Sequence, residues 1–170
     1  VAGMDLSVAY QEYGGIMAGK SVTCEAARVA GVPYTNVIGT HAKSIIKIDT
    51  RSNASLFTAQ IAIADNKINY QDTKLISYPL VDGKKLWYNT DKNSKIFAGL
   101  EGLNGNVEKG SVVFSITGDS RQLYKSPLIR QGVTPIKVQV NLAGVRILEM
   151  VVEDGGDGAS GDHALWIDPQ

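Results

Sequence analysis

Two histidines are the residues of this chain whose type and setting best suit chemistry. His41 lies in IGTHAKS and His163 lies in SGDHALW, so both imidazoles stand among small residues. A two-histidine metal centre takes a carboxylate as third ligand, and Asp162 or Asp168 could supply it. The alternative is that each imidazole hydrogen-bonds loop backbone and fixes a strand end. The spacing favours this alternative, because no HxH or HxxxH pattern places both rings on one face.

The stretch DGGDGASGDHALW, residues 154–166, intersperses carboxylates with glycines. Oxygen ligands on a flexible glycine loop suit calcium, and the candidate ligands are Asp154, Asp157 and Asp162. The spacing differs from that of an EF-hand, and a tight loop between strands requires Gly and Asp for backbone reasons alone. A structural calcium ion, here or elsewhere in the domain, is one hypothesis. A loop with a purely structural role is the other.

Aromatic side chains bear on sugar binding, because a pyranose stacks its apolar face on Trp or Tyr while its hydroxyls bond amide or charged groups. The chain has two tryptophans. Trp87 lies in a predicted hairpin, where its ring could face solvent. Trp166 lies in the apolar run ALWID, where a place in the core fits equally well. The candidate ligand-binding residues are His41, Trp87, Asp157, Asp162, His163 and Trp166.

Composition argues against several kinds of partner. Seventeen basic residues balance seventeen acidic ones, and the zero net charge argues against nucleic acid and against a polybasic membrane surface. No run approaches about eighteen apolar residues, so no membrane span is expected. The chain starts at Val1 with no initiator Met and no signal peptide, and we expect it to be a segment of a longer or processed protein.

The elements that must position these residues are predicted to be strands. Apolar and polar residues alternate with period two in LFTAQIAIA (56–64), SVVFSIT (111–117) and IKVQVNL (136–142), which is typical of half-buried strands. VRILEMVV (145–152) is apolar on nearly both faces and predicts an interior strand covered on both sides. SYPLVDGKKLWYN (77–89) predicts a hairpin that turns at Asp82-Gly83.

One segment has helical character, TCEAARVAG (23–31), with Thr23 as a candidate cap. Many short strands, glycine-rich turns and almost no helix predict an all-β fold, an antiparallel β-sandwich of jelly-roll type. We expect a single domain over residues 1–170, with the least patterned stretch, 65–109, as an insertion.

Four segments in fixed order resemble the NPCBM/NEW2 domain, which overlaps carbohydrate-binding module family 51. The joint order of GTHA, GSVVF, GD and GDHALW is far more specific than any one of these pieces. The segments are VPYTNVIGTHAKSIIKID (32–49), LFTAQIAIAD (56–65), GSVVFSITGDSRQLYKS (110–126) and IKVQVNLAGVRILEMVVEDGGDGASGDHALWID (136–168).

The resemblance implies a galactose-binding-like β-sandwich of jelly-roll type. It also implies attachment to a secreted or surface glycoside hydrolase, and most such enzymes are bacterial. It implies a noncatalytic domain that binds galactose-containing or related glycans, often with a structural calcium. The expected location is extracellular, at the cell surface or in the periplasm.

The chain departs from the family pattern in three places. Where the family has a tryptophan in a GWG-like patch, this chain has YGGIMAGKS (13–21). Its closing motif is DHALWID in place of DHADWAD, with Leu165 at the second aspartate. The stretch 65–109 is much longer than the family's connection, and such an insertion could cover, extend or remodel a binding site.

Three hypotheses therefore stand. A carbohydrate-binding module would raise the local concentration of its attached enzyme at the substrate. A structural domain would instead pack against the catalytic module without binding sugar, which an exposed apolar patch of Trp87, Tyr88 and Phe97 would favour. A metal-dependent enzyme would use His41, His163 and an aspartate.

Overall fold

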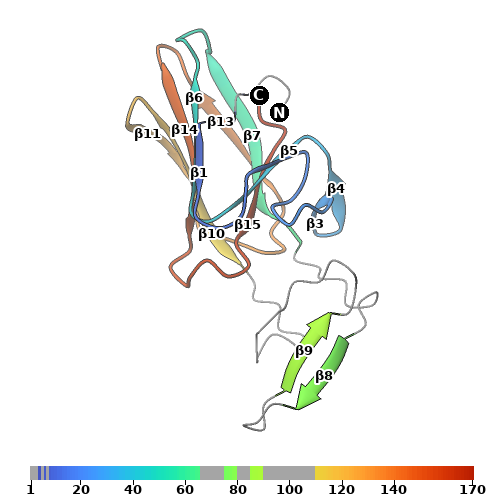
Figure 1. The fold of residues 1–170 in the computed structure, drawn as a ribbon. Coiled ribbons are helices and arrows are strands. Elements are labelled where there is room, and N and C mark those ends of the chain that lie inside the picture. Colours follow the sequence, from blue (N-terminus) through green and yellow to red (C-terminus); the bar gives the residue numbers. More distant parts are fainter. Residues whose placement is uncertain (1–3, 5, 7, 66–74, 80–84, 90–109) are drawn as a thin grey trace. The chain divides into compact units, whose positions relative to one another are not determined.

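The computed structural model describes residues 4, 6, 8–65, 75–79, 85–89 and 110–170 (Figure 1). Backbone contacts divide the chain into two units. The larger, which we call the sandwich, comprises residues 1–65 and 108–170, and the smaller comprises residues 66–107. The described residues form strands and no helix. Among them there is accordingly no helix long and apolar enough to cross a membrane.

Two antiparallel sheets make up the sandwich (Figure 1). Sheet A contains, in spatial order, β1 (Ala9–Gln11), β6 (Ser44–Asp49), β14 (Ile147–Asp154), β10 (Ser111–Gly118) and β11 (Arg121–Lys125), with β12 (Ile129–Arg130) also paired to β10. Sheet B contains, in spatial order, β13 (Ile136–Asn141), β7 (Leu56–Ile63), β15 (His163–Ile167), β5 (Val37–His41) and β2 (Met17–Ala18). The predicted antiparallel β-sandwich is confirmed, and the predicted strands at 56–64, 111–117 and 136–142 correspond to β7, β10 and β13.

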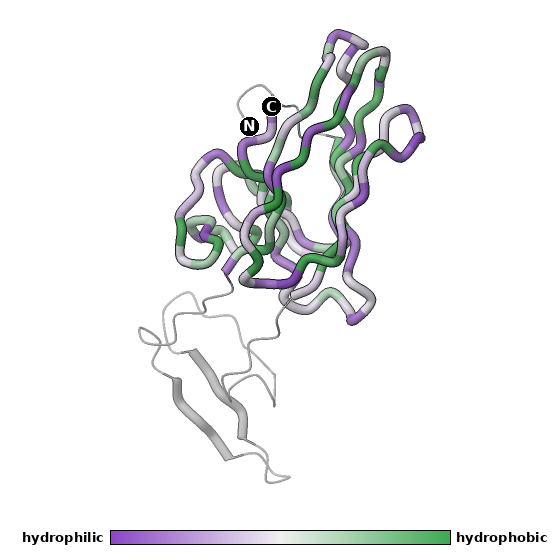
Figure 2. Tube along the Cα trace, turned by 180° about the vertical axis from the view of Figure 1, so that it is seen from behind, coloured by the Kyte–Doolittle hydropathy of each residue, from purple (hydrophilic) through white to green (hydrophobic). Residues whose placement is uncertain are grey.

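The core lies between the two sheets because alternate residues of each strand point inward. Val112, Phe114 and Ile116 of β10 are completely buried, and hydrophobic and hydrophilic residues alternate along the strands in Figure 2. The Trp166 ring sits in this core at 0% exposure, with its centroid 4.9 Å from that of Phe114 in an edge-to-face arrangement. Aromatic burial of this kind is a large contribution to core stability.

A second, smaller core lies on the outer face of sheet B. Leu165 and Ile167 of β15 are buried there against Ala27 and Val29 of the hairpin formed by β3 (Ala27–Val29) and β4 (Val32–Tyr34). Ala164 and Trp166 of the same strand face the inter-sheet core. Strand β15 is therefore covered on both faces.

The interior strand was expected elsewhere, at 145–152. The corresponding strand, β14, is central in sheet A, but only one of its faces is fully buried. Glu149 lies on the other face, where its carboxylate accepts a hydrogen bond from Thr117 (2.7 Å) and pairs with Lys47 (2.7 Å). Ile147 and Val151 on that face are half-buried, and no further layer of the described residues packs on them.

The predicted helix at 23–31 was wrong, because this segment enters the β3–β4 hairpin. Ala30 and Gly31 form its turn with positive φ values of 49° and 80°. The Asp65 carboxylate accepts hydrogen bonds from the backbone N–H groups of Ala30 (2.8 Å) and Gly31 (2.7 Å). This long-range tie outweighs the weak local helix propensity of a short alanine-rich segment.

In the smaller unit, β8 (Leu75–Pro79) and β9 (Lys85–Asn89) pair antiparallel, with Ser77 opposite Trp87. The predicted hairpin strands are thus present. The predicted turn at Asp82-Gly83 lies outside the described residues. The backbone contacts divide the chain into two units, as reported above. The expectation of one domain with an insertion stays a prediction.

Candidate functional site

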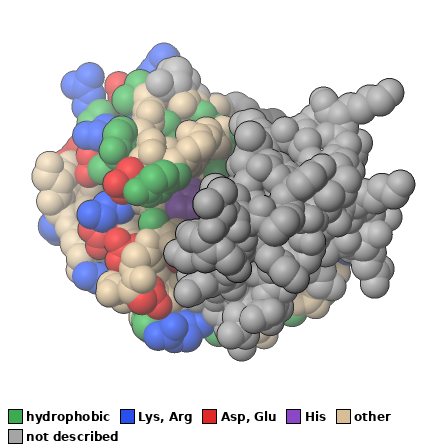
Figure 3. Space-filling model, turned by 60° about the horizontal axis from the view of Figure 1, so that its bottom comes forward, with side chains coloured by type: hydrophobic (Ala, Val, Ile, Leu, Met, Phe, Trp, Pro, Cys, Tyr) green, Lys and Arg blue, Asp and Glu red, His purple; other side chains and the backbone are tan. Residues whose placement is uncertain are grey.

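The two histidines that lie far apart in the sequence meet at one end of the sandwich. His41 is the last residue of β5 and His163 is the first residue of β15, and antiparallel pairing places them directly opposite each other. Their ring centroids lie 5.5 Å apart at an interplanar angle of 58°. Both side chains are half-buried, and histidine atoms reach the surface in Figure 3, near carboxylates and hydrophobic groups.

An exposed aromatic ring extends this pair. The Tyr13 ring is edge-on to His41, with centroids 5.6 Å apart, and Tyr13 remains 54% exposed. Gln11 holds the segment in place, because its amide oxygen accepts a hydrogen bond from the His41 backbone N–H (2.9 Å) and its amide nitrogen donates to the Tyr13 carbonyl (2.6 Å). We call Tyr13, His41 and His163 the histidine–tyrosine surface.

Hydrogen bonding assigns the tautomer of His41. Its Nδ1 lies 2.6 Å from the Ala42 carbonyl oxygen, which can only accept, so we assign the proton to Nδ1. In the neutral ring Nε2 then keeps its lone pair. Burial, and secondarily the charge of His41, lowers the pKa of His163 to about 4, so that ring is neutral at pH 7. The surface thus offers an exposed aromatic ring and, at His163, a neutral imidazole.

Asp162 lies beneath this surface and is completely buried. Its Oδ1 accepts a hydrogen bond from the Ser111 backbone N–H (2.8 Å), while Oδ2 has no hydrogen-bond partner among the described residues. Burial raises the pKa of Asp162 to about 6, against the opposing effects of the Ser111 N–H and of His41. The structure places the Asp162 side chain below the surface, and its predicted contact with a ligand stays a prediction.

Trp166 lies in the core. Its ring is at 0% exposure between the sheets, which agrees with the core role that the sequence left open, and its predicted contact with sugar stays a prediction. The side chain of Trp87 lies outside the described residues, as do those of Tyr88 and Phe97. The apolar patch that these three would form stays a prediction.

The predicted calcium ligands each serve the local backbone. Asp154 accepts from the Gly156 N–H (2.7 Å), and Asp157 accepts from the Ser111 hydroxyl (2.6 Å) while lying 3.7 Å from the Arg130 guanidinium. Within the described part of the chain, no three His, Cys, Asp or Glu side chains are arranged to hold a metal ion. These carboxylates are therefore not gathered into one cluster, and calcium binding on this loop or elsewhere in the domain stays a prediction.

Asp168 does not join the histidines either. It follows the far end of β15, about 16 Å from His163 by the rise of a strand. Its carboxylate accepts a hydrogen bond from the Asn36 side chain (3.2 Å). A metal centre of both histidines and Asp168, one of the options that the sequence left open, is thus not formed.

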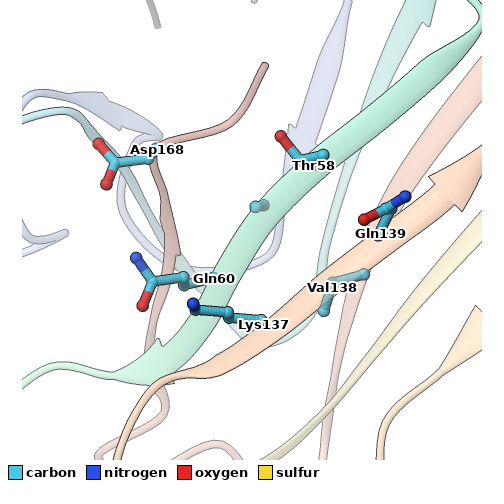
Figure 4. Close-up of a pocket in the computed structure, with 7 residues that line it drawn as sticks. Thr58, Gln60, Lys137, Val138, Gln139 and Asp168 are labelled. Carbon is cyan, nitrogen blue, oxygen red and sulfur yellow. The ribbon is translucent and has the colours of Figure 1, made fainter.

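A polar trough that sequence reasoning missed lies on the outer face of sheet B (Figure 4). It has a volume of about 270 Å³ and runs along β7 and β13. Its polar residues on β7 and β13 are only the outward-facing half of two alternating strands, so no motif marks them in the sequence. Its lining residues are Thr58, Ala59, Gln60, Lys137, Val138, Gln139 and Asp168.

One sequence match has no counterpart in the fold. Residues 14–21, GGIMAGKS, satisfy the GxxxxGK[ST] pattern of phosphate-binding loops. That loop requires a strand before it and a helix after it. Here Met17 and Ala18 themselves form strand β2, paired with β5, and no helix follows among the described residues. The match therefore does not indicate a nucleotide site.

Jelly-roll sandwiches with loops gathered at one end are an architecture of lectin-type domains. The chain belongs to the NPCBM/NEW2 domain family, a family of carbohydrate-binding modules, whose model matches residues 1–90 and 84–170. The predicted resemblance is thereby confirmed.

A curated protein of Renibacterium salmoninarum is 27% identical over 139 residues, which cover 82% of this chain and 7% of that protein. Its name provisionally describes an endo-alpha-N-acetylgalactosaminidase. This chain therefore spans only a small fraction of the length of that relative.

Solved structures of carbohydrate-binding module family 51 share the fold. The CBM51 of Clostridium perfringens GH95, in complex with methyl-galactose, has a TM-score of 0.67 and 22% identity over 98% of this chain and 93% of its own. The CBM51-2 and INT domains of Clostridium perfringens ZmpB have a TM-score of 0.68 and 15% identity, and the match covers 98% of this chain and 29% of that one. At these identities the likeness establishes the β-sandwich fold alone.

Proposed function

We propose that this chain is a noncatalytic carbohydrate-binding module attached to a glycoside hydrolase, and that it binds galactose-containing or related glycans at the histidine–tyrosine surface. Membership of the family supports carbohydrate binding. The name of the Renibacterium relative supports the enzyme context, and the methyl-galactose complex of a structural neighbour supports the sugar class. Such an attachment would place the domain outside the cytoplasm.

The observation that carries this proposal is the exposed Tyr13 ring fixed against His41. A pyranose has one apolar face, which can stack on this ring, and hydroxyls that can donate to His41 Nε2. Because Gln11 holds the Tyr13 and His41 backbone and the Ala42 carbonyl holds the His41 ring, little entropy is lost by these groups on binding.

Isothermal titration of the 170-residue chain against methyl-galactoside and a broad glycan panel tests the proposal. We expect modest affinity, since a shallow surface buries few sugar atoms. The site assignment is tested with Tyr13→Ala, and Tyr10→Ala is its matched control, because Tyr10 is equally exposed (60%) and its ring does not contact His41. Silence across the panel, or equal loss in both variants, would contradict the proposal.

A further inference from the structure

The polar trough on sheet B is formed by two rows of side chains. Pairing of β7 with β13 places Gln60 opposite Lys137 and Thr58 opposite Gln139. Side chains two residues apart on one strand point to the same face, so the two rows lie about 7 Å apart. In Figure 4 Gln60 and Lys137 lie side by side, and Asp168 lies on the neighbouring segment.

The polar side chains that β7 and β13 contribute to the trough are not used in hydrogen bonds or ion pairs that hold the fold together. Within the part of the chain that the structure describes, no side-chain hydrogen bond or ion pair involves Thr58, Gln60, Lys137 or Gln139. They are half-buried or exposed, and they offer two amides, a hydroxyl and an ammonium group. Asp168 adds a carboxylate whose position is held by Asn36. Donors and acceptors are therefore both available to a ligand.

The chemistry of the trough matches a neutral, hydroxyl-rich ligand. One ammonium group and one carboxylate balance each other, so neither an anion nor a cation is favoured. No aromatic ring lines the trough, so recognition would depend on hydrogen bonds rather than on stacking. Sugar hydroxyls donate and accept at once, which amide side chains match best.

We propose that the trough is a second glycan subsite, which contacts neutral oligosaccharides of two or more units. The rows are about 7 Å apart, and a ligand of two or more sugar units presents more hydroxyls to them than one unit does, so it should bind the trough more strongly. Asp168 is about 16 Å along β15 from His163, so one monosaccharide cannot reach both surfaces. The inference rests on the proposed function, to which it adds a second region of contact with the glycan.

The test is titration of the whole 170-residue chain, labelled for backbone-amide NMR, with methyl-galactoside and with neutral galactose-containing di- and tetrasaccharides. Oligosaccharides are expected to shift the amides of Thr58, Gln60, Lys137 and Gln139, and methyl-galactoside is expected to shift only those near Tyr13. Lys137→Met and Gln139→Ala are each expected to weaken oligosaccharide binding roughly threefold to tenfold, as for the loss of one hydrogen bond. Lys125→Met, an exposed lysine of sheet A, is the control.

The possible outcomes separate the two proposals. If the trough amides stay silent while those near Tyr13 respond, or if Lys137→Met binds oligosaccharides like the control, the second subsite is refuted and the proposed function stands. If the trough responds and the Tyr13 region is silent, the second subsite stands and the histidine–tyrosine surface is refuted. If no glycan shifts either region, both are refuted.

Discussion

The histidine–tyrosine surface is assembled from the ends of strands and a loop, whereas the trough is built from two neighbouring strands. At the first, Tyr13, His41 and His163 come from three separate segments and lie over a buried aspartate. At the second, every group but Asp168 belongs to β7 or β13. The first combines an aromatic ring with fixed imidazoles, and the second offers hydrogen bonds only.

The difference indicates distinct roles. A surface with a stacking ring and preorganised partners can bind a single sugar, because little ordering is needed. A shallow row of free polar side chains gains little from one sugar and more from a chain of them. The first surface also depends on packing below it, so mutations there should affect stability and pH response. Mutations in the trough should change neither the stability nor its pH dependence appreciably.

The largest expected effect is that of Gly110→Ala, which disturbs the support of the histidine end alone. A Cβ at Gly110 would overlap the Gly161 carbonyl oxygen, one residue before Asp162. We expect a loss of about 2–4 kcal/mol in the free energy of unfolding, measured in urea. Gly15→Ala is the control, since its Cβ would meet only Met17 Cε at 3.9 Å. Equal stability of the two variants would contradict the packing described for this end.

The next effect concerns Asp162. Its pKa is raised from 3.8 to about 6 in the folded state, so the group favours folding at low pH and this contribution is lost as the pH rises from about 4 to 6. Asp162→Asn cannot ionise. Its stability relative to the original chain should therefore increase across this window, by at most about 3 kcal/mol. Urea unfolding at pH 4, 5 and 7 checks this, and a pH-independent difference would refute it.

His163 should respond in the opposite direction. Its pKa is lowered from 6.5 to about 4, so its contribution is present above pH 6.5 and is lost as the pH falls toward 4. His163→Gln should flatten that part of the stability profile, by less than the Asp162 effect because the ring is partly exposed to solvent. Lys137→Met in the trough should leave the pH dependence of the free energy of unfolding unchanged. A changed pH dependence in that variant would contradict the expectation that only the histidine–tyrosine surface responds to pH.

A smaller effect is expected for Tyr13→Ala on sugar affinity. Loss of the stacking ring should weaken methyl-galactoside binding about tenfold, or about 1.4 kcal/mol. Stability should change little, because Tyr13 is mostly exposed. Titration calorimetry beside thermal unfolding separates the two, and a loss of stability equal to the loss of affinity would indicate a structural role for the ring.

The smallest effect is expected for Lys137→Met on stability and on monosaccharide binding. The side chain is exposed and has no ion pair among the described residues, so the free energy of unfolding should stay within about 0.5 kcal/mol. Methyl-galactoside affinity should match that of the original chain. Weaker monosaccharide binding in this variant would show that the two surfaces are one site.

Much of this protein is determined by local sequence. Alternation of apolar and polar residues identified β7, β10 and β13, because a strand exposes every second side chain to the core. The ordered motifs from GTHA to GDHALW identified the family, and their two histidines proved to be cross-strand partners. Local pattern misled at residues 23–31, where a turn held by distant Asp65 replaced the expected helix.

Tertiary structure alone decided which polar and aromatic residues are available. Trp166 and Asp162 have the residue types of ligand contacts, yet both are fully buried, since β15 is covered on both faces and Asp162 is held by Ser111 from another sheet. Tyr13, in an unremarkable glycine-rich stretch, becomes an exposed ring against His41. Burial and cross-strand proximity depend on contacts between segments far apart in the sequence, 51 residues for Ser111 and Asp162 and 122 for His41 and His163, which no local pattern records.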